Sequence, residues 1–426
     1  MDRFLDGRSY DVIIIGAGII GLTTAYELLK RGRKVAIVDA ADPMQGCSAG
    51  NAGYLAEANI FPPASRETLK QVPKMLLDRN GPLVISPAYL PALVPWGVRL
   101  ARSVREPNER LIRRQLASLT TRAIDSYSSL LRDIGAQEMI ERKGGLVACL
   151  EQATLESRSR ILPVFAEHGV EARRLNRREV LELEPALTPK IAGGIFYPNS
   201  ARCVNPQRLG LVLARFLLAN GVQLVKGKVT GMSREAISPA ASIQAWNVRL
   251  AEGTLAGNQV VVCAGRAADS LMKLLGHPVS LASERGYHLM LEEPNVALNR
   301  PVVFAEPFFA ATPMEHGLRL AGTAEFAHAD KPMTNGRADM LFELAKPYLP
   351  GVERGRATRW MGVRPTTPDG LPVMGQSSTH EGLFYSFGHG HIGLTTAAVS
   401  ADCVAAAMAK EKPPLDLKPF SVDRFK

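Results

Sequence analysis

Hydrophobic residues near the start of the chain form two runs that are joined by a glycine-rich, helix-like segment. Val12 to Ile15 are four consecutive β-branched residues, which is typical of a central parallel strand buried on both faces. A second apolar run, Val35 to Val38, ends at Asp39. Between the runs the helical pattern extends to about Lys30, and Gly32 is placed to end it. The pattern predicts a strand, a turn, a helix and a second strand.

Three glycines in the predicted turn indicate what this unit binds. Gly16 allows the sharp turn, Gly18 lets the backbone approach a pyrophosphate, and Gly21 lets the helix lie close to the strand. The free N–H groups at the helix N-terminus favour the phosphates. Asp39 is placed to accept the hydroxyls of an adenosine ribose, and it disfavours a 2′-phosphate. The unit predicts a dinucleotide site and leaves flavin and nicotinamide dinucleotides as alternatives.

Strand and helix patterns alternate along the rest of the chain. They predict helices near 112–135, 206–220 and 395–410, and strands at 144–150, 193–197, 222–225 and 260–263. The last of these strands ends in Ala264 and Gly265, which we expect to bring another backbone amide to the adenosine half of the dinucleotide. From about residue 277 to 350 the pattern changes to alternating strands at 287–291, 302–305 and 318–322, which predicts an inserted antiparallel sheet.

Two glycine-rich segments near the C-terminus carry polar side chains. Residues 361–375, MGVRPTTPDGLPVMG, predict a loop whose backbone approaches a ligand closely, with Arg364 inside it. Residues 388–394, GHGHIGL, precede the last predicted helix, whose N-terminal dipole is suited to stabilise negative charge on a reduced flavin.

An apolar stretch at residues 83–100 contains Tyr89, Trp96 and three prolines spaced four residues apart, so we expect an irregular hairpin and no regular helix. Basic residues follow it, at Arg99, Arg102, Arg105, Arg113 and Arg114. Residues 83–105 are therefore either a hairpin that rests on a membrane surface, or a lid or core-packing loop.

Charge and cysteine content narrow the function class. The chain has 51 basic and 41 acidic residues, a net charge of +10, but the basic residues are dispersed and accompany no nucleic-acid-binding module. The charge predicts a solvated basic surface or attraction to an anionic bilayer, and no nucleic-acid partner. Five cysteines without a CxxC pair, and eight histidines without HExxH, predict neither a disulfide framework nor a metal site.

Four ordered motifs together resemble the D-amino-acid oxidase superfamily of flavoproteins, and within it the bacterial D-amino acid dehydrogenases. They are the glycine fingerprint, CSAGNAGY at 47–54, GVRPTTPDGLPVMG at 362–375 and PFSVDRF at 419–425. The resemblance implies an α/β fold, α+β overall. A Rossmann-like FAD-binding domain is assembled from residues 1–80, 200–270 and 355–426, and residues 81–199 and 271–354 form an antiparallel-sheet substrate-binding domain.

The resemblance also implies roles for individual residues. Arg364 matches an arginine that binds the substrate carboxylate, and Tyr287 matches a substrate-side tyrosine. Glycine-oxidase-like relatives have an arginine where this chain has His391, and either His391 or Tyr287 is a candidate to deprotonate the substrate ammonium. Sarcosine-oxidase-like relatives attach flavin through a cysteine where this chain has Gly362, so noncovalent FAD is expected. The cofactor-binding set is Gly16, Gly18, Ile19, Ile20, Gly21, Asp39, Ala40, Ser48, Gly50, Asn51, Ala52, Gly53, Val229, Ala264, Gly265, Gly388, Gly390, His391, Ile392, Gly393 and Leu394.

The implied activity is oxidative deamination of a D-amino acid with a free carboxylate. A hydride passes from Cα to flavin N5, and the imino acid hydrolyses to a 2-oxo acid and ammonia. The alternatives are a secondary amine substrate, such as hydroxy-D-proline or an N-alkyl glycine, an NAD-dependent dehydrogenase, and a non-catalytic FAD subunit. The expected electron acceptor is a respiratory-chain quinone, with oxygen as the alternative. The expected location is the bacterial cytoplasm, free or at the cytoplasmic face of the inner membrane.

Overall fold

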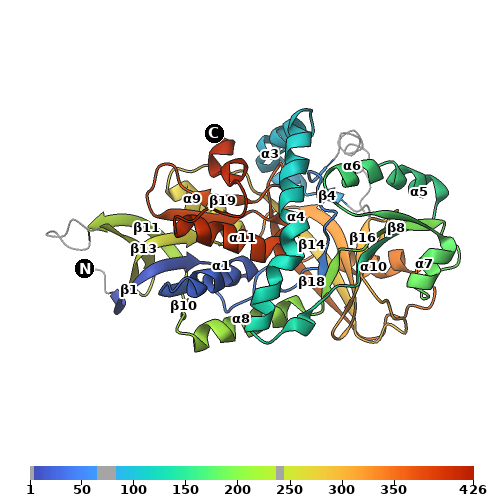
Figure 1. Cartoon of the computed structure of the whole chain (residues 1–426), viewed down its shortest axis with the longest axis horizontal. Coiled ribbons are helices and arrows are strands. Elements are labelled where there is room, and N and C mark those ends of the chain that lie inside the picture. The colour runs from blue at the N-terminus through green and yellow to red at the C-terminus, as the bar shows by residue number, and fades with distance from the viewer. Residues whose placement is uncertain (1–3, 65–82, 237–243) are drawn as a thin grey trace.

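The structure is a computed structural model that describes residues 4–64, 83–236 and 244–426. Figure 1 shows two sheet-based halves, with the long helix α4 (Asn108–Asp133) between them. The boundary expected between residues 80 and 81 lies outside the described residues. The domain limits stay a prediction, and the strands that make up each sheet are as follows.

The first sheet contains the predicted dinucleotide unit. Four parallel strands lie in the order β10 (Gln223–Lys226), β2 (Val35–Asp39), β1 (Phe4–Ile15) and β13 (Thr254–Val262). Antiparallel β12 (Gln244–Leu250) and β11 (Val229–Ala236) continue from β13, which also pairs in parallel with β20 (Leu383–Phe387). β19 (Val373–Gln376) is antiparallel to β20. The predicted parallel nucleotide-binding sheet is confirmed.

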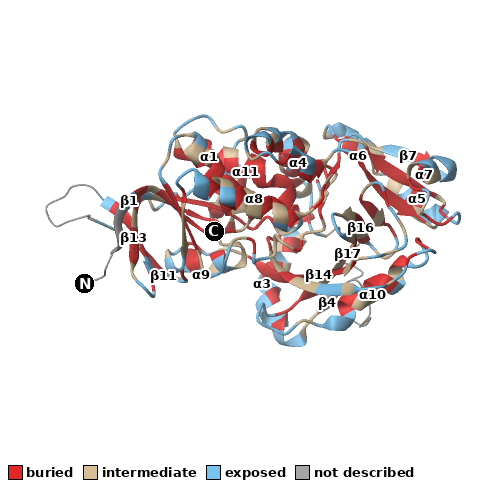
Figure 2. Cartoon of the chain, turned by 90° about the horizontal axis from the view of Figure 1, so that it is seen from below, coloured by how far each residue is buried: buried red, intermediate tan, exposed pale blue. Residues whose placement is uncertain are grey.

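Helices cover the first sheet because its strands are apolar on both faces. Val12 and Ile14 of β1 pack in one buried cluster, whereas Ile13 and Ile15 pack in the other. The first cluster includes residues of α1 (Ile19–Lys30), α8 (Pro206–Ala219), α11 (Gly393–Met408) and α4, and Figure 2 shows α11 as largely buried. α9 (Ala268–Leu274) packs with the second cluster.

The second sheet is mainly antiparallel. Its order is β18 (Ala357–Thr366), β14 (Ala282–Leu291), β17 (Gly317–Phe326), β16 (Phe309–Met314), β15 (Val302–Phe304), β6 (Gly145–Cys149), β8 (Gly193–Tyr197) and β7 (Arg173–Asn176). The short β4 (Leu83–Ile85) pairs with β17. The far end carries α5 (Gln152–Ser159), α6 (Leu162–Glu167) and α7 (Arg177–Leu183). A third, small sheet joins β3 (Tyr54–Leu55), β9 (Ala201–Cys203) and β5 (Ile140–Glu141).

The expectation of an irregular hairpin at residues 83–100 is wrong. After β4 the chain forms α3 (Leu90–Ser103), in spite of its prolines. Pro91 lies in the first turn, where a backbone N–H has no intrahelical acceptor, so only Pro95 removes an interior hydrogen bond. Burial of Leu93, Trp96 and Leu100 stabilises the helix against that loss.

Two further differences concern the segments around the inserted sheet. Residues 361–366 are not a loop, because they belong to β18, which pairs along its whole length with β14 of the second sheet. The segment 355–426, predicted to belong to the cofactor domain, therefore begins with a strand of the second sheet. The predicted run of strands at 277–350 also contains a helix, α10 (Asn335–Ala345), which covers one face of the second sheet.

One segment of the described chain, Gly390–Met408, is long and apolar enough to cross a membrane. Inside the molecule 78% of it is buried. Its packing against α1 and α4 explains its composition as that of a core helix.

Candidate active site

The turn after β1 forms a tight glycine cradle. Gly16 has a φ of +117°, and a Cβ there would lie 2.4 Å from the carbonyl oxygen of Cys263. A Cβ on Gly21 would lie 1.9 Å from the carbonyl oxygen of Gly16. Around Gly18, in contrast, the nearest atom that a Cβ would meet is Ser48 Oγ, at 3.4 Å. The first and third glycines therefore close the turn, while the second leaves its outer side accessible.

The carboxyl edge of the first sheet brings several predicted cofactor residues together. Asp39 Oδ2 accepts a hydrogen bond from Ala17 N at 2.7 Å, so the carboxylate lies at the glycine turn. Ala264 and Gly265 directly follow Cys263, whose amide bonds Ile15 O at 2.8 Å. Ala40 follows Asp39, and Val229 begins the neighbouring β11, two residues after Gly227, whose amide donates to Asp39 O.

Residues 48–53 run from this edge to the second sheet. At one end, Ser48 Oγ accepts from the amide of Ile19, in the first turn of α1 beside Ile20. At the other end, Gly50 O bonds His288 Nδ1 at 3.0 Å, and Asn51 O accepts from Arg319 Nη1 at 2.5 Å. Ala52 and Gly53 continue into β3. The segment thus connects the glycine cradle with β14 and β17.

Arg364 lies on β18 directly opposite Glu284 of β14. Its Nη1 is 2.9 Å from Glu284 Oε1, and its side chain is 24% exposed. The guanidinium lies over Gly286, because a Cβ there would be 2.3 Å from Arg364 Cζ. A glycine on β14 therefore gives the guanidinium its place on the sheet.

Glu284 joins three elements. Its other oxygen, Oε2, accepts from Thr366 Oγ1 at 2.7 Å, and Oε1 also lies 2.9 Å from His391 Nε2. Burial alone raises the pKa of this carboxyl, but His391, Arg364 and Thr366 together hold it well below its usual range. Glu284 is consequently ionised and positions both Arg364 and His391.

His391 belongs to the glycine-rich turn that opens α11. Gly388 and Gly390 both have positive φ values, of +73° and +47°. They turn the chain so that the imidazole, with its side chain 51% exposed, reaches Glu284. Gly393 begins α11, and Ile392 and Leu394 are buried in the core. At these two positions we therefore expect backbone, and not side-chain, contacts with a cofactor.

The resemblance implies that Tyr287 lies on the substrate side, but the structure places Tyr287 and Arg364 on opposite faces of the sheet. Successive residues of a strand point to opposite faces, and Tyr287 lies on the face of β14 that α10 covers. Its hydroxyl donates to Glu325, and its ring is near Arg285 and Arg337. Tyr287 is thus part of a buried polar cluster behind the sheet.

Five further residues, not predicted from the sequence, lie on the face that carries Arg364: Glu284, Gly286, His288, Arg319 and Trp360. Trp360 stacks on His288, with 5.0 Å between ring centroids, and a Cβ on Gly50 or Gly362 would meet the indole. The stretch Glu-Arg-Gly-Tyr-His at 284–288 shows no alternation of apolar and polar residues, so the sequence alone does not show which side chains face the site. Only pairing with β18 shows which of these side chains share a face.

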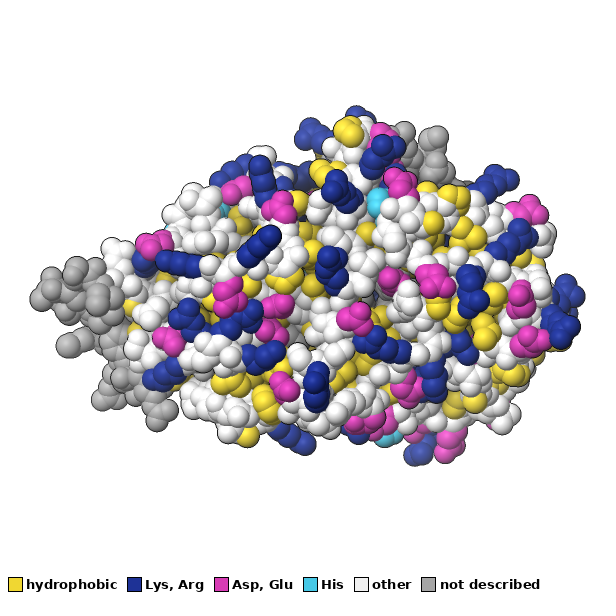
Figure 3. All heavy atoms as spheres, in the orientation of Figure 1, with side chains coloured by type: hydrophobic (Ala, Val, Ile, Leu, Met, Phe, Trp, Pro, Cys, Tyr) yellow, Lys and Arg dark blue, Asp and Glu magenta, His cyan; other side chains and the backbone are white. Residues whose placement is uncertain are grey.

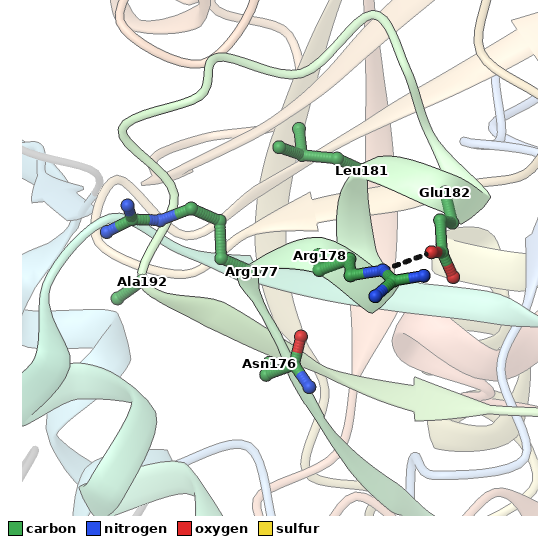
Figure 4. Close-up of a pocket in the computed structure, with 6 residues that line it drawn as sticks. All are labelled: Asn176, Arg177, Arg178, Leu181, Glu182 and Ala192. Atoms are coloured by element: carbon green, nitrogen blue, oxygen red, sulfur yellow. Dashed lines mark hydrogen bonds and ion pairs between the residues drawn. The ribbon is translucent and has the colours of Figure 1, made fainter.

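The pocket drawn in Figure 4 lies elsewhere, at the far end of the second sheet. β7, α7 and Ala192 line it, and the ion pair of Arg178 Nε with Glu182 Oε1, at 2.8 Å, is at its side. It contains none of the predicted site residues.

Stability should fall in mild acid because His389, beside the site, is buried and neutral. Its Nε2 is 3.2 Å from Ser400 Oγ, and burial lowers its pKa to about 3. Between about pH 6.5 and 3 the unfolded chain therefore binds a proton that the folded protein does not, so stability falls as pH falls, by up to about 1.4 kcal/mol per pH unit.

Denaturant unfolding from pH 7 to 4 should show a shallower pH dependence for His389→Gln than for the wild type. His316→Gln is the control, because the His316 side chain is 75% exposed. Equal slopes for the wild type and His389→Gln would contradict this explanation.

The residues at the sheet edge fit FAD. The glycine cradle accepts a pyrophosphate only if no Cβ fills it, and the α1 N-terminus has no capping side-chain hydrogen bond at Gly18. Asp39 supplies the carboxylate that a ribose requires. Among the described residues, no cluster of three or more metal-ligating side chains occurs.

Comparison with known proteins agrees with this geometry. The model of the DAO family, described as FAD dependent oxidoreductase, matches residues 11–407. The chain is 32% identical to a D-amino-acid oxidase of Bradyrhizobium diazoefficiens, over 97% of this chain and 98% of that protein. It is 28% identical to a D-amino acid dehydrogenase of the same organism, with the same coverage. The glycine oxidase structure from Geobacillus kaustophilus has the same fold, with a TM-score of 0.73 and 23% identity over 97% of this chain and 98% of that one. The chain belongs to the DAO family of FAD-dependent oxidoreductases.

Proposed function

We propose that this protein oxidises D-amino acids to imino acids, which water converts to 2-oxo acids and ammonia. The observation that carries the proposal is Arg364, a partly exposed guanidinium that Glu284 orients on the same sheet face as the segment leading to the cofactor edge. The relatives named D-amino-acid oxidase and D-amino acid dehydrogenase support the choice of substrate class and enantiomer.

Bound FAD supplies the hydride acceptor for the substrate Cα–H. Gly16, Gly18 and Gly21 would hold its pyrophosphate, Asp39 its adenosine ribose, and residues 48–53 would pass beside its ring. We propose that the attachment is noncovalent, so acid denaturation should release all of the flavin into solution.

Arg364 would bind the substrate carboxylate. A guanidinium offers five N–H donors in a plane, and only Nη1 is used by Glu284, so the rest of the fork remains for a bidentate contact. Because Glu284 fixes the plane of the guanidinium, the bound carboxylate fixes the direction of the Cα–H bond.

His391 would accept the proton that the substrate ammonium must lose before a hydride leaves Cα. With the Nε2 proton donated to Glu284, the neutral imidazole keeps Nδ1 as an acceptor. Glu284 then stabilises the imidazolium that results. The exposed position of His391 lets this proton pass on to water.

The test is turnover of a panel of amines by the FAD-loaded enzyme, with the oxo acid and ammonia both measured. D-amino acids should give both products in equal amounts, and their L-enantiomers should give none. If sarcosine or proline reacts faster than every D-amino acid, the secondary-amine alternative replaces this proposal.

We further propose that a membrane quinone receives the electrons, with the protein held at an anionic bilayer through α3. The outer face of α3 exposes Leu90, Val94 and Val98, at 47%, 55% and 49%, and Leu111 of α4, a helix that contacts α3, is 54% exposed. Figure 1 places α3 and one end of α4 at the top of the molecule. Figure 3, in the same orientation, shows hydrophobic and basic side chains together on this projection. The arginines at 102, 105, 110 and 114, on α3, α4 and the turn between these helices, are exposed.

The inner face of α3 connects this surface with the site. Trp96 Nε1 donates to Thr366 O at 2.9 Å, and Tyr89 Oη accepts from the amide of Ser283 at 2.9 Å. Thr366 donates a hydrogen bond to Glu284, and Ser283 precedes Glu284 on β14. A bilayer on α3 would therefore lie next to the strands that carry Arg364.

Binding to phosphatidylglycerol vesicles should test this surface. The double variant Val94→Asp/Val98→Asp should bind them at least tenfold more weakly than the wild type, because it places charge in the apolar layer. Leu274→Asp is the matched control, since Leu274 is 63% exposed on α9. The proposal fails if the wild type does not cosediment with these vesicles, or if the double variant cosediments equally well.

A further inference from the structure

A second arginine, Arg319, lies on the same sheet face as Arg364 and takes no part in the chemistry described so far. It is on β17 opposite Met290, and Met290 shares a face of β14 with Glu284 and His288, because these residues are separated by even numbers. Its Nη1 donates to Asn51 O at 2.5 Å, so its head group reaches the segment at 48–53.

Arg319 is a mostly buried cation without an acidic partner. Within the described part of the chain no carboxylate lies within ion-pair distance of it, and its buried Nε has no hydrogen-bond partner. Arg364 and Arg285, on the same sheet, pair with Glu284 and Glu325. Burial lowers the pKa of Arg319 to about 10, so it is still charged at neutral pH. Burying an unpaired charge is costly, which indicates that a negative charge is present near it when the protein works.

The neighbours of Arg319 do not supply that negative charge. His288, which holds the adjacent carbonyl of Gly50, stays neutral, because burial and then the charge of Arg319 lower its pKa to about 3. Glu284 is balanced by Arg364 and His391. The group around residues 50–51 therefore carries a net positive charge, on Arg319.

We propose that Arg319 stabilises the negative charge that FAD gains when it is reduced, and so raises the reduction potential of the bound cofactor. This inference rests on the proposed position of FAD beside residues 48–53. A flavin that takes up a hydride without a further proton is an anion, and a fixed cation close to its ring favours that form. Arg319 is then an electrostatic residue of the flavin site, whereas Arg364 serves the substrate.

The experiment measures the midpoint potential of bound FAD by chemical reduction with redox dyes, which requires no amine substrate. In Arg319→Gln the potential should be at least 30 mV more negative than in the wild type, which for two electrons is a tenfold shift toward oxidised flavin. Sulfite, which adds to oxidised flavin as an anion, should bind at least tenfold more weakly. Arg319→Lys should retain most of the wild-type values, and Arg178→Gln, which removes an 87% exposed arginine, should not change them.

Suppose that Arg319→Gln still binds FAD. A midpoint potential within about 9 mV of the wild type, which is a twofold shift for two electrons, and a sulfite affinity within twofold of the wild type would then overturn the proposal. If Arg319→Gln does not retain FAD, Arg319→Lys decides. A lysine in this mostly buried position has a lowered pKa, so sulfite affinity relative to the wild type should fall as the pH rises from 7 to 9, where Arg319 of the wild type is still charged. A constant ratio across that range would overturn the proposal. Both readouts are independent of whether D-amino acids are the substrates.

Discussion

Arg364→Ala should raise KM for D-amino acids at least about 100-fold, with FAD content unchanged. A bidentate contact between a guanidinium and a carboxylate comprises two charge-assisted hydrogen bonds, each worth about 1.5–3 kcal/mol, and every 1.4 kcal/mol corresponds to a factor of ten. Arg364→Lys should recover part of the loss, since it restores the charge without the planar fork. Steady-state kinetics across a substrate concentration series measures the KM of both variants.

Arg359→Ala is the matched control for this prediction. Arg359 is on the same strand, β18, but it pairs with Asp339 of α10, behind the sheet. Its removal should change KM less than twofold. Normal turnover by Arg364→Ala at low substrate concentration would refute the assignment of the carboxylate to Arg364.

Gly21→Ala should weaken FAD binding at least about 100-fold. The added Cβ would lie 1.9 Å from the carbonyl oxygen of Gly16, which belongs to the backbone and cannot rotate away. Helix α1 must then move off the turn, and its N-terminal amides leave the position where they meet the pyrophosphate. Flavin content after purification and equilibrium titration of FAD measure the effect.

Gly46→Ala is the control for steric change close to the same loop, because a Cβ there meets no atom within 4 Å and the residue has no positive φ. It should bind FAD like the wild type. Full flavin content in Gly21→Ala would show that the close packing of α1 on the turn is not required for the cofactor.

The nucleotide-binding half could be predicted from sequence because its local signals agree with its packing. The apolar run at 12–15 and the helix at 19–30 each fix their own conformation, and both are confirmed. The helix α3 could not be predicted, since proline at 95 argues against it and only the burial of Leu93, Trp96 and Leu100 outweighs that cost. The strand character of 361–366 likewise depends on its partner, β14.

The candidate site was predictable only in part, for a similar reason. Arg364 and His391 are distinctive because each lies in a glycine-rich segment, and the structure brings both to Glu284. Glu284 itself lies in a stretch where both faces are polar, so the sequence does not indicate which residues face the site. The same ambiguity explains why Tyr287 was expected beside the substrate and lies behind the sheet.

The central claim is that this site transfers a hydride from an amino acid to FAD, and anaerobic mixing tests it most directly. The purified holoenzyme is mixed with D-alanine or L-alanine in the absence of oxygen, and the visible absorbance of oxidised flavin is followed. Full bleaching by D-alanine in a single turnover, with none by L-alanine and strongly slowed bleaching in Arg364→Ala, is the predicted result. Flavin that stays oxidised with every amino acid and secondary amine would contradict the account.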